Sequence, residues 1–212
     1  MNVDKKIERI QDVMSKIEPN KVTILTGSNG SGKSLIRKQV CFELSRKLEL
    51  DEPSGLIASV SMQLRTESNP FLGALSSCMH DCAWHPTSLS TYDLVKNLIN
   101  SATKEGGKKK YLVIDEPEIG MSRESQLGFV LYLQKRLPEI MDSTYGLLII
   151  THSELIVDAL KDDAVFINMD NENRTAEDWI LREIIPTDFE VLDDESMELF
   201  EAIRDYSKEK DL

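Results

Sequence analysis

Cysteine is scarce in this sequence: its 212 residues contain three, and all three lie between Cys41 and Cys82. Three thiols cannot all pair within one chain, so we expect reduced thiols rather than a disulfide framework. No apolar run is long enough to span a membrane. The first ten residues, MNVDKKIERI, have no apolar stretch after their lysines, so no signal peptide is predicted and a cytoplasmic location is expected.

Basic residues are also few. Lysine and arginine number 25 against 37 aspartates and glutamates, which gives a net charge of −12. An acidic surface repels phosphates, so extensive nucleic-acid binding is not predicted. The one basic run, KEGGKKK at 104–110, is typical of a solvated loop before a buried strand.

Internal repeats and low-complexity linkers are absent, and the length and composition suit a single soluble domain. We expect one domain over 1–212. Its core is predicted at 21–169, with an N-terminal helix at 4–18 and an acidic C-terminal tail at 170–212.

Short apolar strands alternate with amphipathic helices along the chain. Strands are predicted at 21–27, 55–63, 111–117, 146–153 and 164–169. Helices are predicted at 4–17, 33–48, 71–83, 92–102, 123–136, 154–160 and 195–208, while 178–185 is left unassigned. This alternation predicts an α/β protein with a mostly parallel sheet covered by helices on both faces. Ligands bind such sheets beyond the carboxyl ends of the strands.

A phosphate-binding loop is predicted in TILTGSNGSGKS, which contains the pattern G-x-x-x-x-G-K-[ST] between a strand and a helix. The loop consists of Gly27, Ser28, Asn29, Gly30, Ser31, Gly32, Lys33 and Ser34. Its N–H groups and the following helix N-terminus attract phosphate. Lys33 is expected to reach the β- and γ-phosphates, and Ser34 to ligate Mg²⁺. Gly27 and Gly32 are expected where a Cβ would obstruct the backbone.

Two carboxylates follow the strand YLVID. Asp115 is expected to hold Mg²⁺ through water, and Glu116 to accept a proton from an attacking water. A solvated strand end is the alternative, and the nearby phosphate loop favours the functional interpretation.

Polar residues end two further strands. His152, after LLIIT, is expected to contact the γ-phosphate, unless it is only the neighbour of a helix cap at Ser153. Gln63 is a candidate contact for Mg²⁺ or water, or a surface glutamine.

Taken in order, the phosphate loop, Gln63, LVIDEP and IITHS resemble the ATP-binding-cassette ATPases over roughly 21–169. DEPEIG with LLIITHSELIVDAL looks most like the soluble branch that includes RecF, Rad50/SMC and OLD-type ATPases. The resemblance implies Mg-ATP as ligand and a homodimer that closes head-to-tail over two ATPs. It also implies a separate protein effector, because the 27 positions from Gln63 to Ser90 leave no room for coiled-coil arms and allow only a reduced helical subdomain.

The family's LSGGQ signature is replaced by LSTYD at 89–93. The resemblance implies that Ser90, at a helix start, binds the γ-phosphate held by the other subunit. Ser90 and Asp93 also form a capping box, which places Ser90 at a helix start as well. The family's adenine-stacking aromatic residue is missing too, since no aromatic residue precedes Phe42. No guanine-reading N-K-x-D element is present, so ATP is expected.

Cys78, His80, Cys82 and His85 resemble a zinc ligand set, but their spacing better fits a buried helical face. The sequence therefore predicts a compact, Mg-dependent ATPase whose work is done by a partner. The alternatives are an ATP-gated binding module without turnover and, less favoured because 66–122 contains no arginine, a small-molecule kinase.

Overall fold

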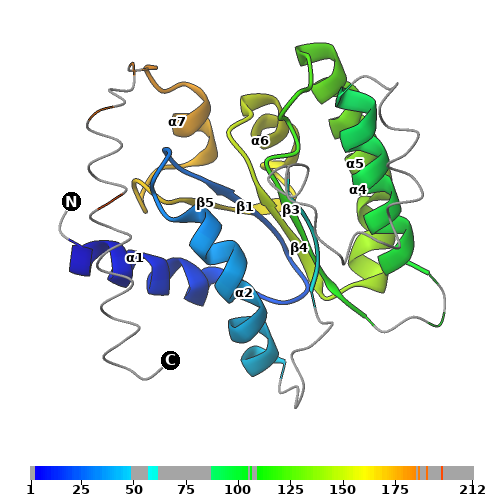
Figure 1. Cartoon of the computed structure of the whole chain (residues 1–212), viewed down its shortest axis with the longest axis horizontal. Helices are drawn as coiled ribbons and strands as arrows, with labels where there is room; N and C mark the ends of the chain where they lie inside the picture. Colours follow the sequence, from blue (N-terminus) through cyan, green and yellow to red (C-terminus); the bar gives the residue numbers. More distant parts are fainter. Residues whose placement is uncertain are drawn as a thin grey trace.

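A five-stranded parallel sheet forms the centre of the computed structural model (Figure 1). The structure describes residues 3–48, 57–61, 87–104, 106, 109–184, 186, 190 and 197. The strands are β1 (Val22–Thr26), β2 (Ile57–Ser61), β3 (Tyr111–Asp115), β4 (Gly146–Ile150) and β5 (Ala164–Asn168). They lie in the order β2-β3-β4-β1-β5, and every neighbouring pair is parallel.

Helices cover both faces of this sheet (Figure 1). One face packs against α1 (Val3–Lys16) and α2 (Lys33–Lys47). The other packs against α4 (Thr87–Ala102), α5 (Arg123–Ser143), α6 (Glu154–Leu160) and α7 (Ala176–Ile180). The predicted fold class, an α/β protein with a parallel sheet between helical layers and a phosphate-loop sequence between its first strand and next helix, is confirmed.

Alternation along the strands divides the core into two. Ile24 and Ile114 face the α4–α7 layer, whereas their neighbours Leu25 and Val113 face α1 and α2. All four side chains are fully buried. Because each face is covered, both sets of side chains must be apolar, and the strands read as continuous hydrophobic runs rather than alternating ones.

Helix α1 is fastened to α2 at its C-terminal end. Ile10 and Val13 are buried on its inner face, and Ile17 is buried directly after its last residue. Lys47, in the last turn of α2, donates to the carbonyls of Ser15 at 2.8 Å and Ile17 at 2.6 Å. A lysine at this point satisfies carbonyls that the helix end leaves without partners, and its charge suits the negative end of the helix dipole. The predicted N-terminal helix is confirmed.

The predicted end of α5 was wrong, because the helix runs through Pro138 to Ser143. A proline inside a helix costs about 3 kcal/mol, since it removes one backbone donor and crowds the preceding turn. Burial of Leu137 and Ile140 on the inner face offsets that cost, and Pro138 itself is exposed.

The predicted start of α4 was also wrong. The helix begins at Thr87, so Ser90 is its fourth residue and not its N-cap. The preceding Pro86 is a signal for an earlier start, because proline suits the first turn of a helix. Helix α7 was not predicted: it spans Ala176–Ile180 and only its last three residues fall in the unassigned stretch 178–185. Thr175 caps it by accepting from the N–H of Asp178. The helix predicted at 71–83 lies outside the described residues, as does nearly all of that predicted at 195–208 and most of the expected helical subdomain.

Candidate functional site

Three strand ends reach the same level at the carboxyl edge of the sheet. Ile150 of β4 is in register with Leu25 of β1 on one side and with Asp115 of β3 on the other. The ladder continues one residue further, because Thr151 donates to Leu25 and Glu116 donates to Ile150. The phosphate loop after β1 and the acidic residues after β3 therefore flank the polar residues that follow β4.

The phosphate loop needs glycine at its two key positions. A Cβ on Gly27 would lie 2.7 Å from Cβ of Met169 and 2.8 Å from Oγ of Ser31. Gly32 precedes α2 with a φ of 102°, in the left-handed region that favours glycine. The expected steric requirement at both glycines is confirmed.

Lys33 folds back over the loop. Its buried ammonium group donates to the carbonyls of Gly27 at 2.9 Å and Ser28 at 2.7 Å. Burial lowers the pKa of Lys33, and surrounding negative charge opposes this shift. The opposing charges are those of Glu116, Asp170, Asp115 and Glu118. A cation surrounded by carboxylates at the mouth of an anion-binding loop is suited to a ligand that carries both phosphate and a divalent metal.

Asp115 is buried beside a cation of the chain. Nε of Arg37, one turn into α2, lies 3.2 Å from Oδ2 of Asp115. The pair brings the strand end of β3 against the helix that follows the phosphate loop. Ser34, the other expected Mg²⁺ ligand, lies in the first turn of α2.

Glu116 sits in a strained backbone conformation, with a φ of 51°. Such values are uncommon outside glycine and are found where surrounding contacts hold the backbone, often at functional sites. The side chain lies 3.5 Å from Nε2 of His152. The pKa of Glu116 is lowered, mainly by His152, with partial burial acting in the opposite direction and Lys33 and Arg37 adding to the lowering. Glu116 is therefore ionised near neutral pH, which is the form in which a carboxylate can accept a proton.

Glu118 is a site residue that sequence analysis missed. Its carboxylate accepts from the hydroxyl of Thr151 at 2.8 Å and from the backbone N–H of His152 at 2.6 Å. Burial raises its pKa, and these hydrogen bonds oppose the shift. Glu118 thus joins the β3 end to the β4 end and orients His152. The available signal was its place two residues after Glu116, on the same turn.

Ser153 both caps α6 and extends this network. Its hydroxyl oxygen accepts from the N–H of Ile156 at 3.3 Å, so the predicted cap is confirmed. The hydroxyl also donates to Oε1 of Gln126 in α5 at 2.7 Å. A hollow of about 290 Å³ opens here, lined by Glu118, Arg123, Gln126, His152, Ser153, Glu154 and Leu155. The histidine is therefore placed between this hollow and Glu116.

Besides Nε of Arg37, which lies against Asp115, two buried polar atoms at the site have no hydrogen-bond partner within the described part of the chain: Oγ of Ser31 and Nε2 of His152, the latter 3.5 Å from Glu116. Leaving a buried polar group unsatisfied costs about 1–3 kcal/mol, and such groups commonly serve a ligand. A phosphate bound on the loop would offer acceptors to both. For Mg²⁺, the fitting group is Asp115, beside the start of α2.

Other candidate residues are not brought to the site by the described structure. Gln63 lies two residues beyond β2 and outside the described residues, as do Cys78, His80, Cys82 and His85. Ser90 lies within α4. Over the described ranges, no three or more His, Cys, Asp or Glu side chains are grouped to hold a metal, and no helix there is long and apolar enough to cross a membrane.

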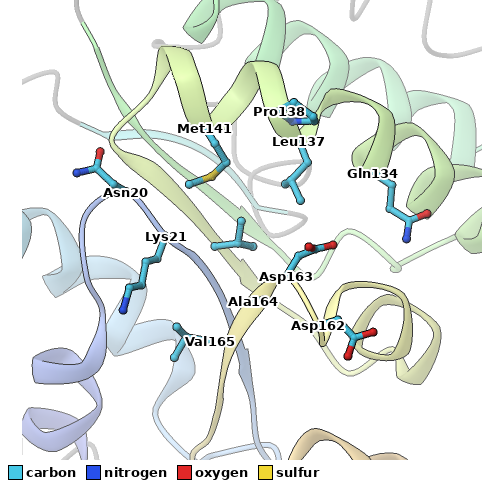
Figure 2. Close-up of a pocket in the computed structure, with 11 residues that line it drawn as sticks. Asn20, Lys21, Gln134, Leu137, Pro138, Met141, Asp162, Asp163, Ala164 and Val165 are labelled. Atoms are coloured by element: carbon cyan, nitrogen blue, oxygen red, sulfur yellow. The ribbon is translucent and has the colours of Figure 1, made fainter.

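A larger hollow, of about 540 Å³, lies at the opposite edge of the sheet (Figure 2). Lys21, directly before β1, and Val22, its first residue, line this hollow. Ala164 and Val165 line it from the start of β5 (Figure 2). The phosphate loop follows the other end of β1, so this hollow is separate from the site described above.

Comparisons with known proteins identify no family. No family model matches the sequence, and no curated protein sequence matches it. Among solved structures, the ORC2 protein of Aeropyrum pernix, determined in ADPNP–ADP complexes, is similar at 15% identity with a TM-score of 0.34. The matched region covers 78% of this chain and 46% of that one, so this chain spans less than half of its length. At this identity and score the likeness says nothing about function, and the cassette-type resemblance stays a prediction.

Proposed function

We propose that this chain binds Mg-ATP at Gly27–Ser34 and hydrolyses it to change the conformation of an assembly. The observation that carries the proposal is the arrangement of strand ends: β4 lies between β1 and β3, so the polar residues after β4 stand between the phosphate loop and Glu116. A nucleotide on the loop would have its terminal phosphate directed at this group of side chains. That arrangement suits attack by water on a phosphoryl group.

Each side chain has a distinct role in this proposal. Glu116 accepts the proton of the attacking water, and its lowered pKa keeps it ionised. Lys33 leaves its carbonyl partners and donates to the phosphates, while His152 stabilises charge on the transferred phosphoryl group. Ser34, Asp115 and Gln63 would hold Mg²⁺, which neutralises phosphate charge.

Thermal unfolding with and without Mg-ATP tests the site. Binding at a hundredfold excess over Kd should stabilise the parent protein by about 2.7 kcal/mol. Lys33→Ala removes the ammonium group that neutralises the phosphates, so the stabilisation should disappear. A shift of equal size in Lys33→Ala would mean that ATP binds elsewhere.

We further propose that ATP drives formation of a homodimer, with Ser90 of one subunit meeting the γ-phosphate held by the other. ADP lacks the bridging phosphate and should not support the dimer. Sedimentation of Glu116→Gln with ATP, with ADP and without nucleotide tests this, and Ser90→Arg should block the ATP-dependent dimer without weakening ATP binding to the monomer. An unchanged mass under all conditions, also in Ser90→Arg, would leave assembly to a separate effector protein.

The second candidate is an ATP-gated binding module with negligible turnover. It is favoured by LSTYD in place of the LSGGQ signature, and by the place of Ser90 as the fourth residue of α4 rather than its N-cap. The dependence of the ATPase rate on protein concentration separates the two: cooperative turnover supports the ATPase, and no turnover at any concentration supports the module. Phosphorylation of a metabolite in a nucleoside panel would instead support a kinase.

A further inference from the structure

The carboxylate of Asp170, two residues after β5, accepts hydrogen bonds from Ser28, the second residue of the phosphate loop. Oδ2 of Asp170 accepts from the backbone N–H of Ser28 at 2.7 Å, and Oδ1 accepts from the Ser28 hydroxyl at 2.8 Å. Both carboxylate oxygens are thus used on one residue. The carbonyl of the same residue accepts from the ammonium group of Lys33, so Asp170 acts on the part of the loop that holds the lysine.

Asp170 is itself held by Asn168, the last residue of β5. Oδ1 of Asn168 accepts from the backbone N–H of Asp170 at 3.2 Å and of Asn171 at 2.8 Å. Its amide nitrogen donates to the hydroxyl of Thr26 at 3.0 Å. Asn168 is buried, and Thr26 ends β1 directly before the loop. The turn that carries Asp170 is therefore built against the strand from which the loop starts.

Helix α1 fixes the same turn from outside. Nη2 of Arg9 donates to the carbonyl of Asn168 at 2.6 Å, and its Nη1 pairs with Glu172 at 3.1 Å. A close contact between Gly27 and Met169 completes the packing, since a Cβ there would have no room. Three segments far apart in the sequence thus bring one carboxylate to Ser28.

We propose that Asp170 is a positioning residue for nucleotide binding: its carboxylate holds Ser28 so that the loop is preformed to receive phosphate. This rests on the proposed function, because it names a further determinant of the same site. Ordering a free loop on binding would cost affinity, so a loop held in advance binds more tightly.

Asp170 also brings a negative charge near a phosphate site, which acts in the opposite direction. The residue is exposed, so water and salt screen that repulsion. The two hydrogen bonds are charge-assisted and short, and they act directly on the loop. The positioning effect therefore outweighs the repulsion, and removing the side chain should weaken binding.

The affinities of variants for Mg-ATP, measured by calorimetry well below their unfolding temperatures, test the proposal. Asp170→Ala should weaken binding about tenfold, the usual effect of losing one charge-assisted hydrogen bond. Asp170→Asn keeps an acceptor and should lose about threefold or less. Ser28→Ala should weaken binding by several-fold, and the double variant by less than the product of the two single losses. Asp163→Ala is the matched control, since it removes an exposed carboxylate just before β5, at the opposite end of the strand from the turn that carries Asp170.

Unchanged or tighter binding of Mg-ATP in Asp170→Ala would overturn the proposal. It would mean that the Asp170 carboxylate repels the phosphates or only packs against the loop, and does not improve nucleotide affinity. Amide hydrogen exchange without nucleotide tests the contact separately from the proposed function. The Ser28 amide should exchange slowly in the parent and in Asp163→Ala, and at least tenfold faster in Asp170→Ala. Equal exchange in all three proteins would also overturn it. If the parent binds no nucleotide while slow exchange is lost in Asp170→Ala, the proposed function fails and the holding of the loop stands.

Discussion

The two halves of the candidate site differ in the chemical groups that form them: one uses the backbone and the other uses side chains. The phosphate-loop half consists of backbone groups, with glycine at Gly27 and Gly32 and a lysine bonded to carbonyls of its own loop. The strand-end half consists of side chains bonded to one another or to neighbouring backbone, with Glu118 joining β3 to β4. The backbone groups of the loop come from consecutive residues, although Asp170 holds them from beyond β5, whereas the side chains of the other half come from separate segments.

This difference explains what each half can do. A loop of backbone donors binds phosphate of any nucleotide and has no proton to transfer. The side-chain half contains the titratable groups, Glu116 and His152, that a hydrolytic step requires. The comparison predicts that variants in the first half change binding and that variants in the second change turnover.

The largest expected effect is in the side-chain half. Glu116→Gln keeps the shape of the side chain but removes the base, so turnover should fall by roughly 10²–10⁴-fold while ATP affinity is retained. Single-turnover hydrolysis and equilibrium binding measured on the same preparation check both parts. Parent-like hydrolysis would show that Glu116 is not the base, and the division between the two halves would fail.

The second-largest effect is expected in the phosphate-loop half. Gly27→Ala would place a methyl group 2.7 Å from Cβ of Met169, so the loop must shift and unfolding should become easier by about 1–3 kcal/mol. Nucleotide affinity should fall with it. Gly128→Ala in α5 is the matched control, because nothing lies within 4 Å of its added Cβ, and there alanine should stabilise the helix by about 0.5–1 kcal/mol. Denaturant unfolding of both variants measures the contrast.

A smaller effect is expected at the link between strand ends. Thr151→Val removes the hydroxyl that donates to Glu118 and accepts from the N–H of Ser153. Glu118 and the N–H of Ser153 each lose a hydrogen bond in the protein interior, so the free energy of unfolding should fall by about 1–2 kcal/mol. The rate of ATP hydrolysis should fall by a larger factor than the affinity for ATP. Thr151→Ser retains the hydroxyl and should keep most of the activity. Equal losses in binding and turnover would contradict the separation of the halves.

The smallest effect is a pH dependence at Glu118. Burial raises its pKa in the folded protein above the ordinary value, so the folded state holds this proton more strongly than the unfolded state. The resulting stability is present below the unfolded pKa and is lost as pH rises through the folded pKa. Glutamine does not titrate, so the stability of the parent relative to Glu118→Gln should decrease as pH rises from about 4. Denaturant unfolding across this range checks the sign, and a constant or increasing difference would contradict it.

Much of the fold was predictable because local patterns determine it. Three helices, α1, α2 and α6, and all five strands were placed to within a few residues by apolar periodicity, and the cap at Ser153 by its type and position. One error came where packing overrode a local signal, because burial of Leu137 and Ile140 carries α5 past Pro138. The other came from a local signal that was missed: α4 begins after Pro86 and before the capping pattern at Ser90. The roles of Gln63 and Ser90 stay predictions.

By itself, the sequence determined the chemistry of each strand end: the glycine loop with Lys33, the acidic pair after β3 and the histidine after β4. These chemical roles can be predicted because each depends on a short motif, and the residue types in that motif rarely occur together for another purpose. Only the tertiary structure decided that β4 lies between β1 and β3, that Glu118 holds the His152 backbone, and that Asp170 bonds Ser28. Strand order and contacts between distant segments depend on how helices pack on the sheet, and no short run of residues contains that information.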